Sequence, residues 1–182
     1  FVDIWRRRQR IVPVDHIRFH PGLCEESCEA IFRCLGDCIE CGTDPQVVSK
    51  AFRELEIDVS TLLNCGSFDT CSYNRIEIAS SDAWVLLALF WDDTKTCIHD
   101  HDQSECGFRI LAGEIEETRY TQLASGKVRE VAKRRLPKGM QVSSHYDAIH
   151  CLSTLPGQQA ISLHAYSPKL DLDEMNVYEV QD

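Results

Sequence analysis

The stretch IHDHDQSECGFRILAG, residues 98–113, carries two histidines one residue apart, then an apolar run and a glycine. Alternate side chains of a β-strand point to the same face, so His99 and His101 would project together into one space. Two imidazoles that converge from one strand are suited to hold a metal ion. The alternative is an exposed polar strand end, because a His-x-His sequence also arises by chance.

Short runs rich in Val, Ile, Leu, Tyr and Thr surround this stretch from residue 71 onward, and turn-forming residues separate them. Many short strands at regular spacing are typical of an antiparallel sandwich or barrel. The predicted strands are Tyr73–Ile78, Trp84–Trp91, Cys97–His101, Gly107–Leu111, Glu114–Thr121, Val128–Arg135, Gln141–Ser143, Ile149–Thr154 and Ile161–Ser167.

The chain before about Leu63 has a different, helical pattern. Apolar residues recur with a period near 3.6 over Glu25–Cys41, and a second helix is expected over Pro45–Leu55. Gly42 separates the two segments as a helix stop. We therefore expect a mainly β protein of one domain, residues 1–182, in which a helical cap (1–65) covers a β-barrel (66–182).

Composition excludes several classes of protein. The 182 residues are 43% hydrophobic and 26% charged, as in ordinary globular proteins, and the net charge is −10. An acidic chain is not expected to bind nucleic acid, and the basic run Trp5–Arg10 is interpreted as a solvated tail. No apolar stretch is long enough to span a membrane, and no secretory signal is recognised, so a cytoplasmic protein is expected.

Ten cysteines are present, and five of them fall in one window. Without a secretory signal, thiols in a reducing compartment are the better expectation than disulfides. Within the window we expect small buried apolar side chains; a structural metal or interhelical disulfides are the alternatives, although the spacing fits no familiar zinc pattern. The window contains Cys24, Cys28, Cys34, Cys38 and Cys41.

A third metal ligand would have to come from a neighbouring strand. His145 follows the turn Pro137-Lys138-Gly139, which leads into a new strand, and is the preferred candidate. His150 is its nearest competitor. On a regular strand the odd spacing from His145 would make His150 face the other way.

The order of these features resembles the two half-motifs of the cupin superfamily: His-x-His, a spaced glycine, a Pro-x-Gly-like turn and a later histidine. Most cupins also have a Glu four or five residues after the second His, a position that falls here in Ser104-Glu105-Cys106. Within the superfamily the chain most resembles the cysteine dioxygenases, over about residues 73–168. That likeness rests on Tyr73-Asn74-Arg75, on residues 99–113 with Cys106 seven residues after His99, on His145, and on Ser162-Leu163-His164-Ala165-Tyr166-Ser167-Pro168.

The resemblance implies a cupin (jelly-roll-like) fold and a role for each matching residue. The iron ligands would be His99, His101 and His145. Arg75 would pair with the substrate carboxylate while Tyr73 helps to position the substrate. Tyr166 would lie near the iron, oriented by Ser162 and His164, and Cys106 would form a thioether crosslink to Tyr166. The Ser167–Pro168 bond would be cis, and the protein a monomer.

The resemblance further implies a cysteine dioxygenase that uses Fe(II) and O₂ to convert L-cysteine to cysteine sulfinic acid. Three neutral histidines leave Fe(II) its full double charge, which favours capture of a thiolate, and zinc would lack the redox chemistry. A dioxygenase of another small thiol such as 3-mercaptopropionate is the nearest rival, although such relatives tend to carry Gln where Arg75 stands. More distant rivals are a cupin isomerase, a dioxygenase of a carbon substrate, and a non-catalytic metal-binding cupin.

Overall fold

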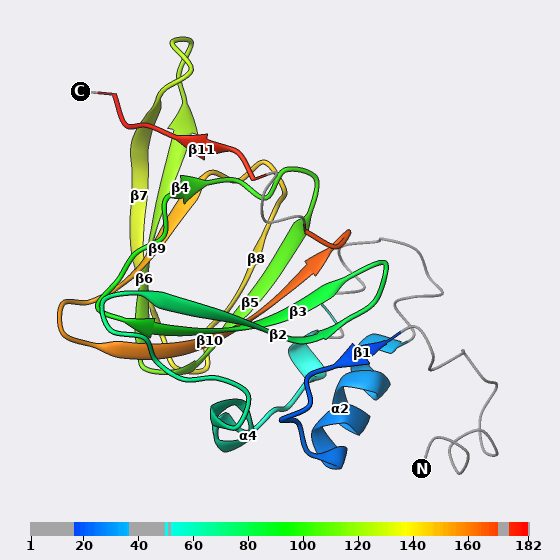
Figure 1. Cartoon of the computed structure of the whole chain (residues 1–182). Helices are drawn as coiled ribbons and strands as arrows, with labels where there is room; N and C mark the ends of the chain where they lie inside the picture. Colours follow the sequence, from blue (N-terminus) through cyan, green and yellow to red (C-terminus); the bar gives the residue numbers. More distant parts are fainter. Residues whose placement is uncertain (1–16, 37–49, 51, 171–174, 182) are drawn as a thin grey trace.

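The computed structural model of the chain describes residues 17–36, 50, 52–170 and 175–181. Its strands form two sheets, in the orders β1-β2-β3-β10-β5-β8 and β11-β4-β9-β6-β7 (Figure 1). The six-stranded sheet contains β1 (Arg18–Phe19), β2 (Tyr73–Ser80), β3 (Val85–Asp92), β10 (Gln159–Ser167), β5 (Glu105–Ala112) and β8 (Gln141–Ser144). The five-stranded sheet contains β11 (Val177–Tyr178), β4 (Ile98–His99), β9 (His150–Thr154), β6 (Glu114–Gln122) and β7 (Val128–Pro137).

Each strand predicted from the sequence is present, with its ends moved by a few residues. The two-residue strands β1 and β11 were not predicted, because two residues are too few to show a periodic pattern. All the strand pairs are antiparallel apart from one isolated bridge, as expected for a sandwich or jelly roll. The strands form two separate sheets rather than one closed barrel.

Strand β3 separates two hydrophobic cores, because it is buried on both faces. Leu86, Ala88 and Phe90 belong to the core under the helices, whereas Leu87 and Trp91 belong to the core between the two sheets. This assignment alternates residue by residue, as the period of a strand requires. The neighbouring strand β10 divides in the same way, with Leu163 and Ala165 on the helical side. Its alternate residues therefore point between the sheets.

Two helices cover the outer face of the six-stranded sheet (Figure 1). Helix α2 (Glu25–Leu35) contributes Ile31 and Leu35 to the core under the helices, and α4 (Val59–Leu63) contributes Leu62. The predicted helix over Glu25–Cys41 is confirmed as far as Leu35. Residues 50 and 52–54 of the second predicted helix are helical. The remainder of both predictions, and the basic run Trp5–Arg10, lie outside the described residues.

The expectation that the clustered cysteines are buried is wrong for Cys24, which is exposed, and Cys28 and Cys34 are only partly buried. Cys38 and Cys41 lie outside the described residues. Among the cysteines that the structure describes, no two form a disulfide. Within the same residues no helix has the length and apolarity needed to cross a lipid bilayer.

The turn between β5 and β6 carries the chain from one sheet to the other. Gly113 adopts a φ of 71° there, a conformation that costs glycine little. A Cβ at this position would also lie 2.3 Å from the carbonyl oxygen of Gln159. The glycine that follows the His-x-His segment is thus required both by the backbone conformation and by close packing against β10.

Candidate metal centre

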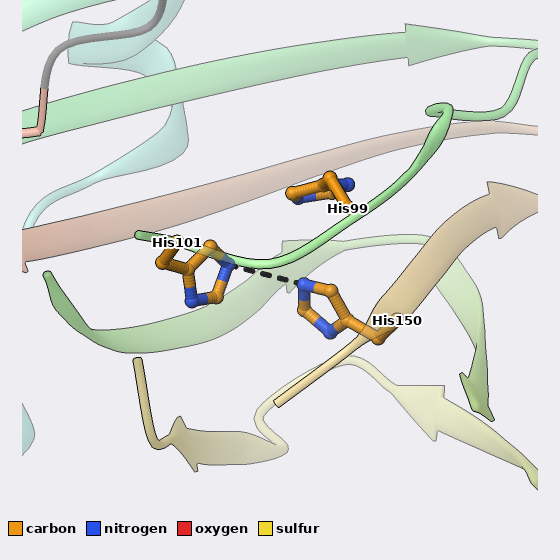
Figure 2. A group of neighbouring side chains, drawn as sticks. All are labelled: His99, His101 and His150. Atoms are coloured by element: carbon orange, nitrogen blue, oxygen red, sulfur yellow. Dashed lines mark hydrogen bonds between the residues drawn. The ribbon is translucent and has the colours of Figure 1, made fainter. Parts of the chain in front are cut away.

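Three histidines from the five-stranded sheet and its adjoining turn meet between the two sheets (Figure 2). His99 ends β4, His101 follows two residues later, and His150 begins β9 directly opposite His99 in the strand register. One ring nitrogen from each lies within 4.8 Å of the others. All three side chains are buried, with exposed fractions of 6%, 1% and 1%.

The hydrogen bonds of the Nδ1 atoms indicate which nitrogens face the centre. Nδ1 of His99 lies 3.0 Å from the carbonyl oxygen of Cys97, and Nδ1 of His150 lies 3.0 Å from Oε1 of Glu117. Both acceptors require a proton on Nδ1, which leaves Nε2 of each ring as the nitrogen able to bind a metal. Nε2 of His101 lies 3.1 Å from Nε2 of His150, the pair joined by the dashed line in Figure 2. A cation placed among these nitrogens would have one ligand atom from each of the three rings.

Burial keeps His99 and His101 uncharged. It lowers the pKa of His99 to about 4 and the pKa of His101 to about 2, and in both cases the nearby His150 adds to the shift. Nδ1 of His101 is also buried without a hydrogen-bond partner among the described residues. Neutral imidazole is the form that binds metal, and it suits Fe, Zn, Cu and Ni alike. The residues present therefore fit a divalent metal ion, and the donor set does not select iron by itself.

The structure does not place His145 with the other two histidines, and the preference for it over His150 is corrected. The side chain of His145 is 59% exposed, and its ring nitrogens lie 3.2 Å from Glu105 and 2.8 Å from Asp147. The parity argument assumed one regular strand from His145 to His150. Instead β8 ends at Ser144, and a turn closed by the bond from Ala148 N–H to the His145 carbonyl precedes β9.

A turn held by Asp100 fixes the position of the two ligands from the His-x-His segment. Its carboxylate accepts hydrogen bonds from the Asp102 backbone N–H (2.9 Å), from Asn176 Nδ2 (3.1 Å) and from the Tyr178 hydroxyl (2.6 Å). Asp102 has a φ of 52°, a conformation that Asp tolerates better than most residues. Pairing of β11 with β4 places Val177 opposite His99. The C-terminal strand thus holds the ligand segment.

Glu117 is a buried carboxylate that the sequence prediction did not include. It points inward from β6 next to Ile115, and its side chain has no exposed surface. Arg134 on the facing strand donates to its Oε2 at 2.6 Å, and Arg119 lies 3.3 Å away. Burial alone would raise the pKa of Glu117, but the bond to His150 and the two arginine contacts together lower it to about 2. The carboxylate therefore stays charged and orients His150 from its outer side.

A chain of hydrogen bonds crosses β10 and ends at Tyr166. The indole Nε1 of Trp91, which can only donate, lies 2.8 Å from Ser162 Oγ. Ser162 Oγ lies 2.7 Å from His164 Nε2, and His164 Nδ1 lies 3.4 Å from the Tyr166 hydroxyl oxygen. Burial lowers the pKa of His164 to about 3, so the ring is neutral.

Tyr166 stays protonated, because complete burial raises the pKa of its phenol well above the usual value. A protonated phenol can donate a hydrogen bond. The ring lies edge-on to His101, with centroids 5.4 Å apart. Cys106 is directly opposite Tyr166 in the register of β5 and β10, and the two side chains are hydrogen bonded. Burial raises the pKa of the Cys106 thiol.

A small cavity adjoins the histidines and is lined by Arg75 and Tyr73 from β2. The guanidinium of Arg75 lies 5.8 Å from the centre of the Tyr73 ring, which stacks on Trp91. Further lining residues are Cys97, His99, His150, His164, Tyr166 and Met175. The cavity is therefore lined by the cationic Arg75, by several aromatic rings and by two of the candidate metal ligands, His99 and His150.

The structure brings together nearly every residue singled out from the sequence. His99, His101, Arg75, Tyr73, Ser162, His164, Tyr166 and Cys106 all lie around this cavity or in direct contact with residues that line it. The Ser167–Pro168 bond is cis. Glu105, near the position of the usual cupin carboxylate, pairs with His145 and is not among the metal-ligand candidates.

Comparison with solved structures identifies the fold of the chain. A Thermus thermophilus protein is 16% identical, with 63% of this chain and 98% of that chain aligned and a TM-score of 0.50. A Klebsiella pneumoniae protein with a double-stranded β-helix domain is 11% identical over 68% and 91% of the two chains, with a TM-score of 0.52. A cupin superfamily protein of Desulfitobacterium hafniense is 14% identical over 63% and 90%, with a TM-score of 0.48. The likeness to the Klebsiella pneumoniae protein shows the fold of this chain, a double-stranded β-helix.

The family follows from the sequence itself. Residues 39–180 match the family described as cysteine dioxygenase type I. This match spans most of the 182 residues, and the chain therefore belongs to that family.

Replacing His150 by Ala should abolish metal retention, whereas replacing His145 by Ala should leave it intact, because only His150 shares the ligand cluster. Each variant would be loaded anaerobically with Fe(II), desalted and assayed for metal by elemental analysis. Circular dichroism would verify that both variants are folded. Retention of iron by the folded His150→Ala variant, together with its loss from His145→Ala, would make His145 the third ligand.

The variant Glu117→Gln should bind the metal about 10- to 100-fold more weakly, because it removes the acceptor charge that orients His150. Glu116→Gln is the matched control, since Glu116 pairs with the half-exposed Lys133 instead. Affinities would be measured by competition with a chelator. Equal affinities for the two variants would contradict the orienting role.

Proposed function

We propose that this protein is a cysteine dioxygenase, which uses Fe(II) and O₂ to convert L-cysteine to cysteine sulfinic acid. Membership of the cysteine dioxygenase type I family supports a thiol dioxygenase activity. The observation that carries the proposal is the juxtaposition of three clustered histidines with a cavity that is lined by Arg75 and Tyr166. This combination can hold a metal, the acid group of a substrate and a hydrogen-bond donor close together.

The three histidines His99, His101 and His150 would hold the iron. Ferrous iron in this site supplies the redox chemistry that allows dioxygen to react with a thiolate, which zinc could not supply. Neutral ligands leave the metal charge uncompensated, so the site favours a substrate that arrives as an anion. Both oxygen atoms end on the substrate sulfur.

Arg75 would bind the substrate carboxylate. Its planar guanidinium matches a carboxylate in a two-point hydrogen-bonded geometry. Tyr73 lies against Arg75 and limits the positions that the guanidinium can take. The carboxylate would fix one end of cysteine while the histidine-bound metal fixes the sulfur.

Tyr166 would donate a hydrogen bond at the reacting end of the substrate. The chain from Trp91 through Ser162 and His164 would hold the hydroxyl in place, and burial prevents the phenol from ionising. A fixed neutral donor stabilises negative charge that develops during oxidation without reorganisation. Cys106, opposite Tyr166, is proposed to form a thioether with its ring. The S–H bond and one ring C–H bond would be lost, with dioxygen as the oxidant that takes up the two hydrogens, and the link would hold the phenol still.

The decisive experiment loads the protein with Fe(II) anaerobically and then supplies oxygen and one of three thiols: cysteine, 3-mercaptopropionate or cysteamine. Sulfinate product would be measured by mass spectrometry. The expected result is more sulfinate from cysteine than from either of the other two thiols. More sulfinate from 3-mercaptopropionate would make that thiol the substrate, and the absence of sulfinate with all three thiols would contradict the proposed class of reaction.

The variant Arg75→Ala should raise KM for cysteine about 10- to 100-fold, because a charged hydrogen bond contributes about 1.5–3 kcal/mol. The KM for cysteamine, which has no carboxylate, should change little. Arg129→Ala, an exposed arginine on β7, is the control. An equal increase in KM for cysteine and cysteamine would contradict the role of Arg75 in binding the carboxylate.

A further inference from the structure

Three thiols gather where the start of α2 meets the end of α4, on the outer side of the six-stranded sheet. Cys24 precedes the first residue of α2, Cys28 lies one turn further along, and Cys65 follows α4. Thr61 links the two segments: its hydroxyl contacts Cys24, and its carbonyl oxygen accepts from Cys65 Sγ at 3.5 Å. We call this group the outer thiol cluster.

The two segments are held in close contact at the outer thiol cluster. A Cβ placed on Gly22 would lie only 2.6 Å from the carbonyl oxygen of Asn64. The backbone of the turn before α2 thus touches the end of α4. The bond from Cys28 N–H to the Cys24 carbonyl, 3.1 Å long, joins Cys24 to the first helical turn. The cluster is therefore part of the folded packing of the cap.

Cys24 is the nucleophile of the cluster. It is exposed, and its Sγ lies 3.2 Å from Ser27 Oγ. Hydrogen bonds from the Ser27 side chain and backbone, and then from Thr61, lower the pKa of the Cys24 thiol. Cys28 and Cys65 are partly buried, and burial raises their pKa values. Because the thiolate is the reactive form, Cys24 reacts before its two neighbours.

Cys24 also lines a surface cavity of about 670 Å³, within the size range of small-molecule sites. The lining contains charges of both signs. Arg109 and Lys138 are the cations, and Glu26, Glu56 and Asp58 are the anions. An occupant that carries both carboxylate and ammonium groups would match this wall better than one with a single charge.

Arg109 is held in place on the wall of the cavity. Its Nη2 donates to the Leu55 carbonyl oxygen, and its guanidinium lies 5.9 Å from the centre of the Phe52 ring. Nε is buried and has no hydrogen-bond partner among the described residues. The cavity therefore offers a fixed positive charge on the strand that packs below the helices.

We propose that Cys24 exchanges with a small zwitterionic disulfide, the oxidised form of an amino-acid or short-peptide thiol, seated in this cavity. An exposed nucleophilic thiol, a second thiol one helical turn away and a cavity of matching charge together define the site. It lies on the opposite side of the six-stranded sheet from the metal centre and shares no lining residue with the metal-site cavity. The proposal therefore stands independently of the reaction proposed above.

The exchange is balanced without a further oxidant. The Cys24 thiolate attacks one sulfur of the ligand, the ligand S–S bond breaks, and the departing thiolate takes up the proton that Cys24 released. The Cys28 thiolate can then attack Cys24 Sγ, which forms a protein disulfide and releases the second small thiol. Two protein thiols are oxidised, and one ligand disulfide is reduced to two thiols.

The test treats the full chain with glutathione disulfide, or with uncharged 2-hydroxyethyl disulfide, under anaerobic conditions. Peptide mapping without reduction would follow the modification of each cysteine with time. In the variant Cys28→Ser/Cys65→Ser the adduct should remain on Cys24. Glutathione disulfide should modify Cys24 about tenfold or more faster than Cys71, which is also exposed but lies outside the cavity, because hydrogen bonds favour the thiolate of Cys24 and the charged cavity seats the ligand beside it.

Charge variants test whether the cavity, and not only the exposure of the thiol, determines the rate at which Cys24 reacts. Lys138→Glu should slow the reaction of Cys24 with glutathione disulfide about threefold or more and leave the reaction with 2-hydroxyethyl disulfide unchanged. Lys127→Glu, in the turn before β7, makes the same charge change away from the cavity and should have no effect. Modification of Cys24 at the rate of Cys71, or equal effects of the two lysine variants, would overturn the proposal.

Discussion

The metal centre depends on three buried imidazoles that meet between the two sheets, and two of them are anchored from the side that faces away from the others. The Cys97 carbonyl anchors His99, and Glu117 anchors His150. Glu117 remains charged between the sheets because His150, Arg134 and Arg119 all approach it. The residues that hold the three ligands in place therefore extend across β4, β9, β6 and β7.

The six-stranded sheet serves two purposes through the alternation of its strands. On β10 the residues Leu163 and Ala165 pack under the helices, while Ser162, His164 and Tyr166 form the polar chain on the inner face. The same alternation on β3 directs Trp91 inward to start that chain. Any shift of register by one residue would exchange the two sets, so the packing of the cap and the geometry of the site are determined together.

Sequence reasoning succeeded where a short-range rule decides the outcome. His99 and His101 do meet as predicted, although β4 ends at His99 and the turn held by Asp100 follows it. The alternation of β10 was enough to place Ser162 with His164 and Tyr166. It failed for His145 because it assumed an unbroken strand across a turn, and a turn resets which face each residue occupies. Glu117 was missed although its inward position beside Ile115 was readable, since its role arises from partners on other strands. The single-domain organisation, monomeric state and cytoplasmic location remain predictions.

The contact between Asp100 and residues 176–178 bears on when the centre can form. The ligand-bearing segment is joined to a strand that lies almost eighty positions later, through Tyr178, Asn176 and the pairing of Val177 with His99. During synthesis the histidines therefore emerge long before the strand that holds them. A nascent chain can form most of both sheets and still lack an ordered ligand turn. Metal capture is then a late event in the formation of this domain, which follows the synthesis of residues 176–178.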